Sequence, residues 1–74
     1  MALTSADIKV DAVVEDTIED EQRGTLPAVR VYYTIAEHGP YSILIPKTEL
    51  SAARVLIDVR QDAQRYIEIL NVTF

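Results

Sequence analysis

The sequence predicts a small α+β domain, in which a three-stranded antiparallel sheet packs one face against a single C-terminal helix. Two stretches in the first half alternate apolar and polar residues, as strands do, and a third short stretch follows a turn. The C-terminal third instead repeats apolar residues at intervals of three and four, as helices do. A sheet and a helix with one apolar side each can cover each other, which is the smallest arrangement of this class. With 74 residues the chain has room for one domain, residues 1–74.

The first predicted strand covers residues 7–18, where apolar residues recur at every second position. Val13 breaks the alternation on the polar side, which indicates a bulge or a contact surface. Residues 19–27 are polar, lack periodicity and contain Gly24 and Pro27, so we expect a long acidic loop there. The apolar residues expected on the buried face are Ile8, Val10, Ala12, Val14 and Ile18.

Residues 28–36 and 41–46 are predicted to form the second and third strands. Both are rich in β-branched and aromatic residues that alternate with polar ones, and Tyr33 and Tyr41 fall on the core side. The connection between them, Glu37-His38-Gly39-Pro40, contains a glycine and a proline and is typical of a hairpin turn.

A helix is predicted over residues 48–70, with Thr48 as the candidate N-cap and Glu49 favourably placed near the positive end of the helix dipole. Residues 66–74 also have strand propensity, so a fourth strand from about Tyr66 is the alternative. The apolar stripe of the helix consists of Ala52, Leu56, Val59, Ala63, Tyr66 and Leu70.

Charge and composition disfavour several classes of function. Residues 1–21 hold seven of the twelve acidic residues but one of the seven basic ones, so nucleic acid and anionic lipid are not expected partners. We expect a cytoplasmic protein, since the first ten residues lack a signal-peptide pattern and no window is apolar enough to span a bilayer. The chain has no cysteine, and therefore no thiolate metal site.

No motif in the sequence indicates catalysis. His38 is the single histidine and has the right chemistry for proton transfer, but no second group or pocket motif accompanies it, which favours a solvated turn residue. The acidic stretch before Gly24 does not place its oxygen ligands as an EF-hand loop does. We therefore expect a protein that is not an enzyme and that uses no catalytic residue, cofactor or metal.

The residues that do indicate a function are of interface type. Arg30, Tyr32 and Leu44 are predicted on the sheet face opposite the helix, and Phe74 ends the chain in an apolar tail. A core this small also gains stability from association, so we expect a homo-oligomer or part of an assembly. The alternative is an acidic regulator or inhibitor that docks on a basic protein surface through Asp16, Glu19, Asp20 and Glu21.

One resemblance adds to this interpretation. The turn His38-Gly39-Pro40-Tyr41, the segment Ile45-Pro46-Lys47 and a helix with Ala63 and Leu70 resemble small uncharacterised proteins encoded in the structural gene clusters of tailed bacteriophages. The resemblance covers about residues 28–70. It implies a virion or assembly component, in the host cytoplasm or the particle, that works by repeated contact.

Overall fold

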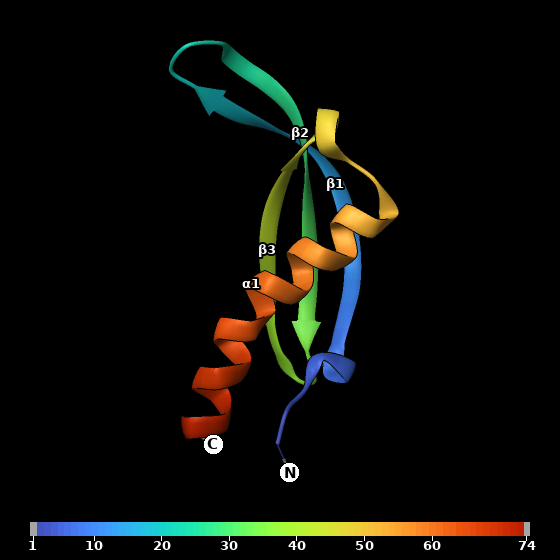
Figure 1. The fold of residues 1–74 in the computed structure, drawn as a ribbon, viewed down its shortest axis with the longest axis vertical. Coiled ribbons are helices and arrows are strands. Elements are labelled where there is room, and N and C mark those ends of the chain that lie inside the picture. The colour runs from blue at the N-terminus through green and yellow to red at the C-terminus, as the bar shows by residue number, and fades with distance from the viewer. Residues whose placement is uncertain (1, 74) are drawn as a thin grey trace.

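The computed structural model describes residues 2–73 and has the α+β fold that the sequence predicts (Figure 1). The strands β1 (Ile8–Asp20), β2 (Gly24–Ile35) and β3 (His38–Pro46) form an antiparallel sheet in the order β1-β2-β3. A short 3-10 helix, η1 (Ser5–Asp7), precedes the sheet, and a second, η2 (Lys47–Glu49), follows it. The helix α1 (Ala52–Thr73) then crosses one face of the sheet diagonally.

The first hairpin is longer than predicted, and the expected loop over residues 19–27 is wrong. Asp20 already pairs with Gly24, so the turn contains three residues. The Asp20 carboxylate accepts hydrogen bonds from the N–H groups of Gln22 and Arg23, at 2.8 and 3.3 Å, and Gly24 has a φ of +76°. Figure 1 shows this end of the hairpin extending past α1, where neither face of the ribbon is covered. Polar residues therefore suit both faces there, which removes the alternation that identifies a strand.

A bulge in β1 corrects the predicted buried face of that strand. The register with β2 shifts between Val10 and Ala12, so the residues after it change faces. Val13 now pairs with the core residue Val31, whereas Ala12 and Val14 lie on the opposite face. Val13 is nevertheless 54% exposed and no residue of β1 is buried, so the prediction of a buried face on this strand is wrong. The irregularity at Val13 is thus the signal of this bulge.

The second hairpin has a tighter turn than predicted. Ile35 pairs with His38, so the connection is Ala36–Glu37, and β3 begins at His38 rather than Tyr41. The register shifts again between Tyr33 and Ile35, opposite the cis peptide bond that joins Gly39 to Pro40. The predicted turn is present, but His38 already pairs with Ile35, and Gly39 and Pro40 form a bulge at the start of β3.

The C-terminal helix begins later and ends later than predicted. Thr48 lies in η2, and Ser51 caps α1 instead, accepting a hydrogen bond from the Arg54 N–H on its Oγ at 3.0 Å. Because α1 continues to Thr73, the alternative of a fourth strand over residues 66–74 is wrong.

The core lies between α1 and the helix-facing side of β2 and β3. Val59 and Ala63 of the predicted helical stripe are buried, but Leu56 is 52% exposed and Ile67, at 5%, takes a core position. One turn after Ile67, Asn71 joins the helix to the segment before β1. Leu3 packs on the core, and its backbone exchanges two hydrogen bonds with the Asn71 amide, at 2.8 and 3.0 Å. The buried cluster consists of Val29, Val31, Tyr33, Ile35, Ile45, Val59, Ala63 and Ile67.

Candidate functional site

The three predicted interface residues lie together on the sheet face opposite α1. Arg30 and Leu44 are direct cross-strand partners, and Tyr32 follows one pair further along, opposite Ser42. Val14 pairs with Arg30 from the other side and is 49% exposed, while Leu44 is 37% exposed. We call Val14, Arg30, Tyr32 and Leu44 the outer patch. It combines aromatic, aliphatic and guanidinium groups on a rigid sheet.

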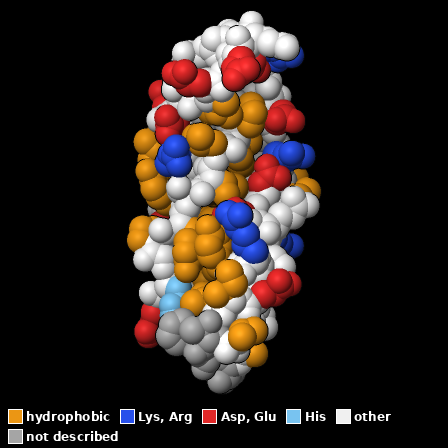
Figure 2. All heavy atoms as spheres, turned by 90° about the vertical axis from the view of Figure 1, so that its left-hand side faces the viewer, with side chains coloured by type: hydrophobic (Ala, Val, Ile, Leu, Met, Phe, Trp, Pro, Cys, Tyr) orange, Lys and Arg blue, Asp and Glu red, His pale blue; other side chains and the backbone are white. Residues whose placement is uncertain are grey.

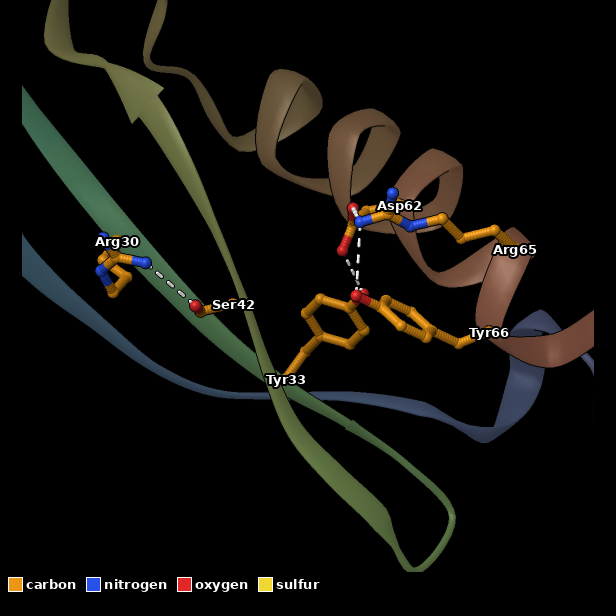
Figure 3. Close-up of polar contacts among 6 residues, drawn as sticks. All are labelled: Arg30, Tyr33, Ser42, Asp62, Arg65 and Tyr66. Carbon is orange, nitrogen blue, oxygen red and sulfur yellow. Dashed lines mark hydrogen bonds and ion pairs between the residues drawn. The ribbon is translucent and has the colours of Figure 1, made fainter. Parts of the chain in front are cut away.

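Arg30 is held in place by two neighbours on the same face. Its Nε donates to Asp16 Oδ2 at 2.8 Å. One terminal nitrogen donates to Ser42 Oγ at 3.0 Å, the contact that Figure 3 shows. The side chains of Arg30 and Asp16 are each about one-third exposed, at 33% and 35%. The hydrogen bond from Arg30, helped by the Thr17 N–H, lowers the pKa of the Asp16 carboxyl below its ordinary value. A fixed guanidinium loses less side-chain freedom when a partner binds it.

The lowered pKa of Asp16 predicts a specific acid sensitivity. A carboxyl with a lower pKa in the folded state stabilises the fold above its unfolded pKa, and this contribution is lost as the pH falls through the folded value. We expect urea unfolding midpoints to drop less between about pH 6 and pH 3 in Asp16→Asn than in the unaltered protein. Glu21→Gln, which removes an acid in the turn, is the matched control. Equal pH dependence in Asp16→Asn and the unaltered protein would show that the Arg30–Asp16 pair does not stabilise the fold.

The four acidic residues of the alternative prediction do not form one loop. Asp16 belongs to the outer face through Arg30, and Asp20 ends β1 and caps the turn. Glu19 and Glu21 are exposed near the tip of the hairpin. The acidic tip therefore presents fewer unengaged carboxylates than the sequence indicates. The sequence alone does not show that these residues are separated, because the separation depends on the cross-strand register, which pairs Asp16 with Ala28.

A second group of polar residues lies where α1 meets β2 beside β3, and sequence reasoning missed it. Asp62, which is not part of the predicted apolar stripe of the helix, accepts a hydrogen bond from the Tyr33 hydroxyl and pairs with Arg65 at 3.0 Å (Figure 3). Burial and the neighbouring carboxylate raise the pKa of Tyr33 above its ordinary value. The sequence did contain a signal for this contact. Asp62 lies one turn from the apolar residues Val59 and Tyr66, and the strand that faces the helix carries a tyrosine.

Stacked aromatic rings continue this group toward the end of the sheet. The rings of Tyr41 and Tyr66 stack with centroids 4.1 Å apart, and Tyr33 and Tyr41 lie 5.6 Å apart. The Arg65 guanidinium carbon is 4.9 Å from the Tyr66 ring centroid. These contacts hold α1 in one orientation about its own axis, with Arg65 and Tyr66 toward the free edge of β3.

An open groove of about 380 Å³ runs along that edge. Figure 2 views the molecule from this side, where hydrophobic side chains lie between charged ones. The groove is shallow, and both apolar and ion-paired side chains line it. It is therefore better suited to contact with another protein surface than to binding a small molecule. Its lining consists of Ile43, Leu44, Asp58, Gln61, Asp62 and Arg65.

The remaining predicted positions contribute little to either group. His38 is the first residue of β3, partly buried and opposite Ile35. Phe74 lies outside the described residues. Within residues 2–73, no three histidine, aspartate or glutamate side chains gather closely enough to hold a metal ion. In the same range, no helix is both long and apolar enough to cross a membrane.

Comparison of the chain with protein-family models, with curated proteins and with solved structures finds no match in any of the three.

Proposed function

We propose that this protein is a non-enzymatic structural or interaction protein, a repeated subunit or adaptor of a larger assembly. One observation carries the proposal: α1 covers one face of the sheet, and the outer patch lies on the other face, with Val14 and Leu44 exposed beside the fixed Arg30. Arginine and tyrosine are among the residue types that dominate binding energy at protein interfaces. The mechanism is burial of this patch, with the strand edges and the exposed end of α1, where Val72 is 89% exposed, as further contacts.

The resemblance of the His38–Tyr41 turn and the following segments to phage structural-cluster proteins supports a phage particle as the assembly. In that case the protein acts in the host cytoplasm or in the virion. The groove beside β3 is open and shallow, and its charged side chains Asp58, Asp62 and Arg65 are already ion-paired, which supports a role by contact rather than by turnover.

The outer patch is tested by crosslinking in native lysate with mass-spectrometric identification. Tyr32→Ser combined with Leu44→Ser is expected to abolish crosslinks to the natural partner, because it removes the central apolar area of the patch. Ile57→Ser, which alters a side chain 50% exposed on α1, is the control and should keep them. Crosslinks that persist in the patch variant, or an unaltered protein that stays strictly monomeric and captures no partner, would overturn the proposal.

A second candidate function is docking of the acidic hairpin tip on a basic protein surface. The projection of the β1–β2 hairpin past α1 favours it, since Glu19 and Glu21 are exposed there (Figure 1). This function predicts that partner binding weakens steeply between low and high salt, and that neutralising Asp16, Glu19, Asp20 and Glu21 abolishes it. Binding that resists both changes would exclude it.

A further inference from the structure

The two free edges of the sheet differ in how they are protected. β1 carries a bulge and several charged residues, including Lys9, Asp11 and Glu15, which are devices that prevent edge strands from pairing with other chains. β3 contains no lysine, arginine, aspartate or glutamate in its nine residues. Its prolines, Pro40 and Pro46, leave the stretch Tyr41–Ile45 between them free of proline. This stretch is the part of the sheet best suited to accept another strand.

The helix surface beside β3 has a self-complementary order of side chains. Asp58, Gln61, Asp62 and Arg65 line the groove together with Ile43 and Leu44 of β3. Asp58 lies three and four residues before Gln61 and Asp62, and Arg65 lies four and three residues after them, so the four residues form one stripe along α1. They are symmetric about a point between Gln61 and Asp62. When two such helices lie antiparallel about that point, Asp58 faces Arg65 of the other copy, and Arg65 faces its Asp58.

We propose that the protein forms a symmetric dimer in which the β3 edges of two copies pair antiparallel through Tyr41–Ile45. A two-fold axis perpendicular to the sheet makes one continuous six-stranded sheet from two three-stranded ones. It also places both α1 helices on the same face, antiparallel, with the Asp58–Arg65 contact made twice. Ile69, which is 59% exposed on the same side of α1, adds apolar area to the helix pair.

This inference deepens the proposed function, on which it rests, by naming a second copy as one partner. The two outer patches then lie on the same face of one sheet, so that a further partner meets a surface of twice the width. The dimer also gains stability. A three-stranded sheet covered by one helix encloses only a thin core, which stabilises a domain of this length poorly.

Charge exchange at Asp58 and Arg65 tests the dimer. In sedimentation equilibrium over a wide concentration range, Asp58→Arg and Arg65→Asp are each expected to weaken association roughly tenfold or more, since each places like charges together at two contacts. The double variant Asp58→Arg/Arg65→Asp is expected to restore it. Within one helix, the double variant keeps a like charge beside Arg54, as in Asp58→Arg, and beside Asp62, as in Arg65→Asp, although Asp58→Arg also places its arginine one turn from Asp62. Sedimentation equilibrium therefore serves as the readout, because it reports association between copies rather than the stability of one helix. Arg60→Asp, elsewhere on α1, is the control and should leave association unchanged.

Amide hydrogen exchange locates the contact independently of charge. Raising the protein concentration is expected to slow exchange in Tyr41–Ile45, while the free edge of β1 keeps its rate. A protein that stays monomeric at every concentration would overturn the dimer, as would association that ignores both single charge changes or protection confined to β1. A monomer that still crosslinks to a partner through the outer patch would refute the dimer and leave the proposed function standing.

Discussion

Tyr33→Ala is expected to lower the free energy of unfolding by about 3–5 kcal/mol, the cost of emptying a large buried aromatic site. The Tyr33 side chain is fully buried at the centre of the sheet and contacts the Tyr41 ring. A domain of this length has a total stability of roughly 4–11 kcal/mol, so the variant should be largely unfolded or close to it. Urea unfolding followed by circular dichroism measures the change.

Tyr33→Phe separates the ring from its hydroxyl. It keeps the packing and loses the hydrogen bond to Asp62, which should cost about 1.5–3 kcal/mol because the acceptor is charged. Asp62 retains Arg65 in this variant, which limits the penalty. Equal losses for the alanine and phenylalanine variants would show that the hydroxyl, rather than the ring, stabilises the helix on the sheet. No loss in either would contradict the position of Tyr33 in the core.

Gly39→Ala is expected to have the second largest effect, about 1–3 kcal/mol from the backbone conformation alone. Gly39 has a φ of +119°, which residues with a Cβ rarely adopt. An added Cβ would also lie 3.1 Å from the Tyr41 nitrogen and 3.2 Å from the Tyr33 carbonyl oxygen, and backbone atoms cannot move aside easily. The start of β3 would have to shift away from β2.

Gly24→Ala is the matched control for this prediction. Gly24 also has a positive φ, of +76°, but no atom lies within 4 Å of a Cβ built there. The Gly24→Ala variant should therefore lose only the cost of a left-handed backbone conformation, roughly 1–2 kcal/mol of its free energy of unfolding. Thermal unfolding of both variants compares them under the same conditions. A Gly24 variant as unstable as the Gly39 variant would mean that crowding at the start of β3 is not what requires glycine.

The sequence predicts the fold class and the element order because periodicity reports which side of an element is covered. It fails at the ends of elements for the same reason. The outer part of the first hairpin has no cover on either face, so its strands leave no alternation in the sequence. At the helix entrance, Thr48 and Ser51 are both residue types that cap helices, and the 3-10 turn at Lys47–Glu49 excludes Thr48 from that role.

The candidate site could be predicted in part. Alternation in β2 and β3 is regular, so Arg30, Tyr32 and Leu44 were placed correctly on one face. The partners of Arg30 depend on the register across two strands, which the bulge in β1 shifts. Asp62 was missed because its burial depends on a tyrosine hydroxyl that is distant in sequence and satisfies its carboxylate.

The paired hydrogen bonds between Leu3 and Asn71 link two segments that otherwise fray separately. The chain leading into β1 and the last turns of α1 lie at the same end of the molecule (Figure 1). Because a reciprocal amide contact joins them, we expect loss of order at either end to be transmitted to the other.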